Sequence, residues 1–230
     1  MRTVVAGLVV AAAVAGCYSP TDYDTRPSGV VLRLSAGSVP ADGASMVLVE
    51  IYAPPQSQSG LSATLAVSAG TLVGAAQGAL SVPVASGDTV RAYWQAPLAT
   101  GTGVVTAKVG SLFVRTGSVV FVAAAPDFVD VEPGSPAVPA KLDSVVSVTI
   151  RLRRTIGMPS LGTPVTLTAS DASGATVGRF LSSTPSDANG LVTARYAPGT
   201  TTYRGPVTIT ATVTVGATVC SGHNTVIVTD

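Results

Sequence analysis

An internal repeat constrains the fold of this chain more than any other feature of its sequence. The segment Val39-Pro40-Ala41 recurs as Val138-Pro139-Ala140, an offset of 99 residues, and alternating blocks follow both copies in the same order. The offset drifts to only 104 by the last match. The matched blocks are Val47, Val49 and Ile51 with Val146, Val148 and Ile150; Ala63, Leu65 and Val67 with Val165, Leu167 and Ala169; 70–72 with 178–180; Val90, Ala92 and Trp94 with Val192, Ala194 and Tyr196; and 106–109 with 210–213. Chance does not produce such an ordered series, so the sequence predicts two copies of one unit.

The repeated blocks have the periodicity of β-strands. In the block 146–152 every second residue is apolar and the residues between are Ser147, Thr149 and Arg151. A period of two places one set on a core face and the other in water. Turn residues such as Asp42-Gly43 separate the blocks, and no long stretch shows a helical stripe. About seven short strands per ~100 residues is the pattern of an immunoglobulin-like sandwich. We therefore expect an all-β fold with two tandem immunoglobulin-like β-sandwich domains, at 29–125 and 126–230.

The order of these blocks resembles a known family of repeats. An alternating strand is followed by Gly-x-Leu/Phe, then by Val-x-Ala-x-aromatic and finally by Thr-Ala-x-Val, in both copies. This order resembles the bacterial immunoglobulin-like repeats of invasins and intimins, and the resemblance covers most of 29–230. It implies a role as a stalk or spacer in surface adhesins. We expect neither an outer-membrane barrel segment nor a terminal lectin-like domain in this chain, so only the spacer role transfers directly.

The N-terminus resembles an export and lipidation signal. Residues 1–16 have a basic start at Arg2 and an uncharged apolar run that is too short to span a membrane. The run ends in Val14-Ala15-Gly16-Cys17, which resembles a bacterial lipobox. The resemblance implies a signal peptide at 1–16, lipidation at Cys17 and a tether at 17–28. The alternative is an ordinary signal peptide with an incidental cysteine.

Composition limits the partners that we expect. Charged residues make up 11% of the chain and the net charge is +1, so we expect no nucleic-acid partner. We also expect no cofactor, and a membrane contact through the N-terminal lipid. The predicted function is that of a non-enzymatic cell-envelope lipoprotein, membrane-anchored at the outer membrane, which acts as a structural spacer or adhesion-type module. The alternative is a glycan- or protein-binding module of an envelope complex that uses loops of the distal domain.

Two residues are candidates for chemistry. His223 is the only histidine, and no Gly-x-Ser-x-Gly nucleophile motif accompanies it. We expect it on the surface, in a turn before the last strand. Cys220 is the remaining thiol if Cys17 is lipidated; we expect a buried small apolar residue, with a free or intermolecularly paired thiol as the alternative.

Other residues are candidates for binding. Asp127, Asp130 and Glu132 gather between the two copies, where carboxylates could bind calcium or form a solvated edge. Arg151 and Arg153 share one strand face, which either meets a partner or discourages aggregation. Tyr93 is the aromatic residue that we expect on the outer face. Trp94 and Tyr196, at matched positions, are predicted core anchors.

Overall fold

The computed structural model describes residues 30–53, 61–76, 78–85, 87–110 and 113–230. Within those ranges the chain is built from strands, and it contains no helix long and apolar enough to cross a membrane. The first nine strands are β1 (Val31–Leu34), β2 (Ser38–Pro40), β3 (Met46–Tyr52), β4 (Leu61–Val67), β5 (Thr71–Leu72), β6 (Ala79–Val84), β7 (Thr89–Gln95), β8 (Gly101–Val109) and β9 (Phe113–Val122). The others are β10 (Phe128–Pro133), β11 (Ala137–Pro139), β12 (Val146–Arg153), β13 (Thr166–Ser170), β14 (Arg179–Ser183), β15 (Leu191–Ala197), β16 (Gly205–Val215) and β17 (Thr218–Thr229).

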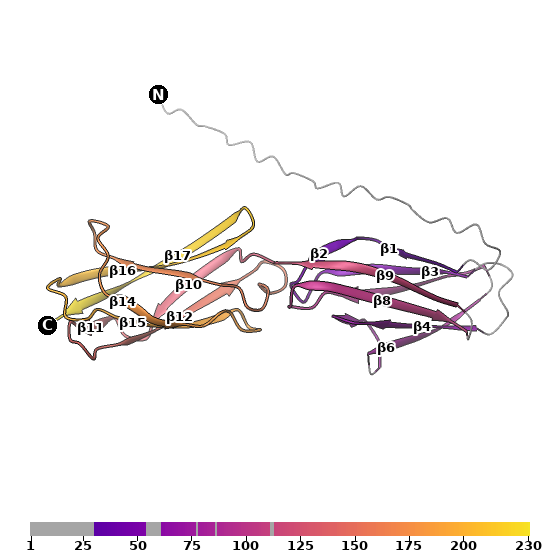
Figure 1. Ribbon diagram of the computed structural model, residues 1–230, viewed down its shortest axis with the longest axis horizontal. Helices are drawn as coiled ribbons and strands as arrows, with labels where there is room; N and C mark the ends of the chain where they lie inside the picture. Colours follow the sequence, from indigo (N-terminus) through magenta and orange to yellow (C-terminus); the bar gives the residue numbers. More distant parts are fainter. Residues whose placement is uncertain (1–29, 54–60, 77, 86, 111–112) are drawn as a thin grey trace, which may run out of the picture.

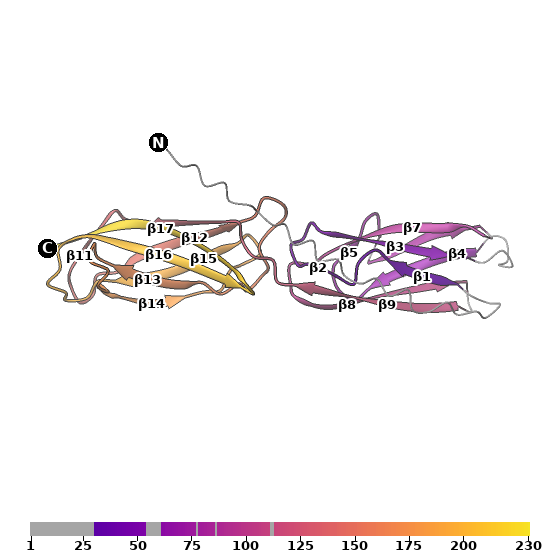
Figure 2. The same ribbon diagram turned by 90° about the horizontal axis from the view of Figure 1, so that it is seen from above.

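The strands form two sandwiches that follow one another along the long axis of the molecule (Figure 1). In the first, a sheet of order β1-β3-β7-β5 packs on a sheet of order β2-β9-β8-β4-β6. In the second, the order β10-β12-β15-β14 packs on β11-β17-β16-β13. A view turned by 90° shows that the strands run along the same long axis in both (Figure 2). The expected pair of tandem immunoglobulin-like sandwiches is confirmed. The division after residue 125 stays a prediction, and it falls between the two cores.

The repeated Val-Pro-Ala segment has the same place in both sandwiches. β2 and β11 each run parallel to the last strand of their own sandwich, with Val39 opposite Phe121 and Val138 opposite Val228. The preceding strands β1 and β10 belong to the opposite sheet. The first strand of each unit is thus divided between two sheets, and in the first sandwich β6 adds an edge strand beside β4. Within the described residues the first sandwich therefore has nine strands and the second has eight. The prediction of about seven strands per unit was therefore too low.

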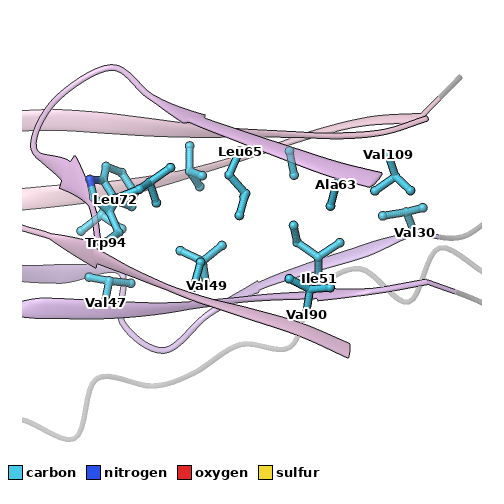
Figure 3. Packing of buried hydrophobic residues seen from close by; sticks show 14 of the residues in the cluster. Val30, Val47, Val49, Ile51, Ala63, Leu65, Leu72, Val90, Trp94 and Val109 are labelled. Carbon is cyan, nitrogen blue, oxygen red and sulfur yellow. The ribbon is translucent and has the colours of Figure 1, made fainter. Parts of the chain in front are cut away.

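The inward side chains of the alternating blocks make the two cores. In the first core, residues such as Val49, Leu65 and Trp94 point in between the two sheets (Figure 3). Trp94 is fully buried and meets the ring of Phe121 edge-on, with 5.4 Å between the ring centroids. Its Nε1 donates a hydrogen bond of 2.8 Å to the carbonyl of Ala69. In the second core the hydroxyl of Tyr196 donates a bond of 2.9 Å to the carbonyl of Val177, and burial raises the pKa of Tyr196 to about 12. Both residues are core anchors, as predicted.

The second sandwich is closed along one edge by the contact of β10 with β17. The amide of Asn224 donates a hydrogen bond of 2.7 Å to the carbonyl of Val131. Gly222, two residues earlier, lies directly under the backbone of β10, because a Cβ built on it would be 1.8 Å from the carbonyl oxygen of Val129. The absence of a side chain at Gly222 is therefore what lets the two strands approach.

Candidate functional site at the junction of the two sandwiches

The loop between β12 and β13 connects the second sandwich to the end of the first. At its centre Ser160 has a relative exposure of 2%. The Ser160 hydroxyl donates a hydrogen bond of 2.9 Å to the carbonyl of Ala41 and accepts one of 2.8 Å from the amide of Ala124. The Ser160 amide donates to the carbonyl of Ala124 at 3.2 Å. One residue of the second sandwich thus bonds to the backbone of two separate segments of the first.

Further backbone bonds on either side of Ser160 extend this contact. The amide of Met158 donates to the carbonyl of Asp42 at 2.8 Å, and the amide of Leu161 donates to the carbonyl of Leu98 at 3.0 Å. Gly157 has a φ of +72°, and a Cβ built on it would be 2.6 Å from the carbonyl oxygen of Asp42. A side chain at this position would therefore both strain the loop and push the two sandwiches apart.

Asp42 anchors the first sandwich's side of the junction. Its carboxylate accepts hydrogen bonds from the amides of Ala44 and Ser45, at 2.9 and 2.7 Å, and from the Ser45 hydroxyl at 2.8 Å. The guanidinium of Arg154, from the second sandwich, lies 3.9 Å from the carboxylate and donates to the carbonyl of Ala125. Burial alone would raise the pKa of Asp42, but these hydrogen bonds and the charge of Arg154 outweigh it, and the pKa lies below its ordinary value. Asp42 is therefore an ionised, fully bonded group at the junction.

The loop is also fixed from its own sandwich. The hydroxyl of Thr163 donates to the carbonyl of Ser160 at 2.6 Å, and the hydroxyl of Ser186 donates to the same carbonyl at 3.2 Å. The amide of Thr163 donates back to the Ser186 hydroxyl at 2.9 Å. All three side chains are buried. Among the described residues no buried side-chain nitrogen or oxygen is without a hydrogen-bond partner. The junction is thus a satisfied polar network, which holds one relative orientation of the two sandwiches because any rotation would break several buried bonds together.

Sequence reasoning missed these residues. It treated Asp42-Gly43 only as a turn between two strands. The available signal was the repeat offset, which rises from 99 to 102 between Ile150 and Val165. The three additional residues fall in the loop that carries Ser160.

The candidate partner-contact residues are all exposed, but they lie on two separate sheet faces. Tyr93 is on the outer face of β7 in the first sandwich, and Arg151 and Arg153 are on the outer face of β12 in the second. Arg153 forms an ion pair of 2.7 Å with Asp130 and lies 5.8 Å from the ring centroid of Phe128. Cys17 lies outside the described residues.

The three candidate calcium ligands are held apart by other partners. Asp127 accepts a hydrogen bond of 2.6 Å from the amide of Thr155, which holds the pKa of its carboxyl below the ordinary value. Asp130 pairs with Arg153, and Glu132 is exposed further along β10. Within the described part of the chain, no three His, Cys, Asp or Glu side chains are placed to hold a metal ion.

The structure corrects two details of the C-terminal candidates. His223 is exposed, but it lies within β17, opposite Thr210, and not in a turn. The turn of the β16–β17 hairpin comes earlier, between Val215 and Thr218, so His223 is the sixth residue of β17. Cys220 is half-buried, with its thiol 3.5 Å from the carbonyl oxygen of Asp127, and is a free cysteine.

Comparison with known proteins supports the fold. Neither a protein-family model nor a curated protein matches the sequence. Among solved structures, the chain is similar to invasin, described as a bacterial integrin-binding protein, with 20% identity and a TM-score of 0.62 over 87% of this chain and 39% of that chain. The D0–D1 domains of intimin match at 18% identity and a TM-score of 0.35, over 87% of this chain and 99% of that one. The chain thus spans well under half of the invasin chain, and the similarity to invasin shows an immunoglobulin-like fold of the same type.

Proposed function

We propose that this chain is a non-enzymatic spacer of the bacterial cell envelope, anchored to the outer membrane by a lipid on Cys17. Two end-to-end sandwiches with a fixed junction form a rod, and a rod holds whatever lies at its far end at a set distance from the membrane. The single observation that carries this proposal is the buried network around Ser160. Independent domains on a flexible linker would not need it, because their relative orientation would be free.

The chemistry of the surface agrees with a spacer. His223, the only histidine, lies on an exposed strand face, where it pairs across the ladder with Thr210. Among the remaining candidates, Asp130, Glu132, Arg151 and Arg153 line one shallow hollow on the outer face of β10 and β12, where Arg153 pairs with Asp130. An adhesive role, with a glycan or protein bound by the distal loops, stays the alternative.

The anchor is tested by fatty-acid labelling. Bacterial cells producing the full chain are grown with an alkyne analogue of palmitate, and labelled protein is detected after purification. We expect label on the native chain and on Cys220→Ser, and none on Cys17→Ser. Equal labelling of the Cys17 variant, or a native chain that leaves the cells unlabelled, would contradict the anchor. Protease treatment of intact cells then separates a surface-exposed rod from a periplasmic one.

The rigid junction is tested by distance measurement between spin labels. Labels at Lys108→Cys on β8 and Arg195→Cys on β15, both exposed, report one distance across the junction in a Cys220→Ser background. We expect one narrow distance distribution in the detergent-purified protein. Ser160→Ala should broaden it, whereas Ser147→Ala, an exposed change on β12, should not. A broad distribution in the parent protein would reject the rod.

A further inference from the structure

The outer face of the sheet β1-β3-β7-β5 has an apolar row near the junction end of the first sandwich. Leu48 lies opposite Tyr93 in the ladder, and the amide of Val73 bonds to the carbonyl of Tyr93. Tyr93 is 53% exposed and Val73 is 47% exposed. Met46, two residues before Leu48 on β3, is 51% exposed. Exposed apolar residues of monomeric proteins are normally scattered singly and not gathered on one face. Aromatic residues and methionine are enriched where proteins contact proteins.

The next row along the same strands is charged. Arg33, Glu50 and Arg91 lie opposite one another on β1, β3 and β7. Glu50 and Arg91 form an ion pair of 2.9 Å, and the three side chains line a shallow hollow of the sheet face. The face therefore has an apolar row and an adjacent row with both signs of charge.

The second sandwich provides an internal control for this face. The residues at the repeat positions of Leu48 and Tyr93 are Ser147 and Arg195, which lie opposite each other on β12 and β15. Those at the positions of the Glu50–Arg91 pair are Thr149 and Thr193, which are also opposite each other. Because the second sandwich forms the same sheet without an apolar row, the fold does not require one in the first.

We propose that this face of the first sandwich binds a second copy of the chain, with the two rods side by side and parallel. A two-fold axis that runs along the strands, between β3 and β7, places β3 of one copy over β7 of the other and keeps every row on the same row. Leu48 then meets Tyr93 of the second copy, and Glu50 meets Arg91 of the second copy. The face is thus complementary to itself in both its apolar and its charged row, and sheets pack face to face in this manner in sandwiches.

The size of the face sets the strength of the contact. The four strands of this face contain 20 residues in total, and with about 4.8 Å between strands and about 3.3 Å of rise per residue they cover roughly 320 Å². A standard interface takes about 800 Å² from each partner, so the pairing is weak in dilute solution. Confinement of both copies to one membrane raises their effective concentration and favours the pair. The parallel orientation of the two rods rests on the proposed lipid anchor, whereas the self-complementarity of the face is independent of that anchor.

The experiment uses two full-length chains with different affinity tags, produced in the same cells and crosslinked with formaldehyde before extraction. Recovery of one tag with the other measures pairing. Glu50→Arg in both chains, or Arg91→Glu in both, places like charges opposite each other, and we expect recovery to fall about tenfold. Glu50→Arg in one chain with Arg91→Glu in the other restores both opposite-charge contacts between the copies, and we expect recovery to return.

The mixed pair separates contact between copies from stability within one copy. Each of its two chains has lost its internal Glu50–Arg91 ion pair, so a merely structural role predicts that the mixture fails as each variant does. Thr149→Arg with Thr193→Glu, at the matched positions of the second sandwich, should leave recovery unchanged. The proposal is overturned if the native chains are not recovered together, if the mixture stays at the level of the single variants, or if only a different protein is crosslinked to the native chain. If palmitate labelling fails while the two chains are still recovered together, the proposed anchor is rejected and the proposed pairing face stands.

Discussion

Replacement of Ser160 by alanine tests the junction most directly. The substitution removes one hydroxyl that bonds to Ala41 and Ala124 across the junction, and leaves a buried carbonyl and a buried amide without their partner. A buried polar group left unpaired costs about 1–3 kcal/mol, so the two together should weaken the coupling between the sandwiches by about 2–6 kcal/mol. Because Ser160 is only 2% exposed, solvent cannot reach the two groups to replace the lost hydrogen bonds.

The assay uses the only tryptophan of the chain. Trp94 is fully buried in the first sandwich, so its fluorescence reports the unfolding of that sandwich alone, whereas Ser160 belongs to the second. With a urea dependence of about 2 kcal/mol per M, we expect Ser160→Ala to lower the midpoint of the tryptophan transition by about 1–3 M. Ser147→Ala, exposed on β12 of the same sandwich, should shift it by less than about 0.25 M. A tryptophan midpoint that does not respond to Ser160→Ala would refute the reasoning, because the two sandwiches would then be energetically independent.

Three further changes have defined outcomes. Gly222→Ala should destabilise the second sandwich by more than about 2 kcal/mol in calorimetry, since its Cβ would lie 1.8 Å from the Val129 carbonyl oxygen, whereas His223→Ala beside it should be neutral. Tyr196→Phe should lower the stability of the same sandwich by about 1–3 kcal/mol, because it leaves the carbonyl of Val177 without its hydrogen-bond partner. An unchanged melting temperature would show that water replaces the hydroxyl. The pKa of Asp42 is lowered in the folded chain, so its stabilising effect is present above about pH 4, the value in unfolded chains, and is lost as the pH falls through the folded pKa. The tryptophan transition should therefore weaken below about pH 4, and Asp42→Asn should remove most of that dependence.

The strands, their inward faces and the core residues could be predicted because these are local properties of the sequence. Apolar residues at every second position determine which face of a strand is buried, and this held for Val47, Val49 and Ile51 as for Val146, Val148 and Ile150. The matched Trp94 and Tyr196 were recognisable for the same reason. The repeat then gave the number of sandwiches, since each copy carries a full set of alternating blocks.

The tertiary structure alone decided what the polar residues do. Ser160 bonds to the carbonyl of Ala41, 119 residues away, and Asp42 and Arg154 meet across the junction from different sandwiches. A serine in a loop has no sequence pattern that predicts its partner. The rows on the outer face likewise depend on ladder register, which brings Leu48 opposite Tyr93 and Glu50 opposite Arg91. Hydrophobic alternation is short-range and repeats along the chain, whereas hydrogen-bond partners are fixed only when distant segments meet. The sequence by itself thus determined two sandwiches, and their packing determined that they are joined as one rod.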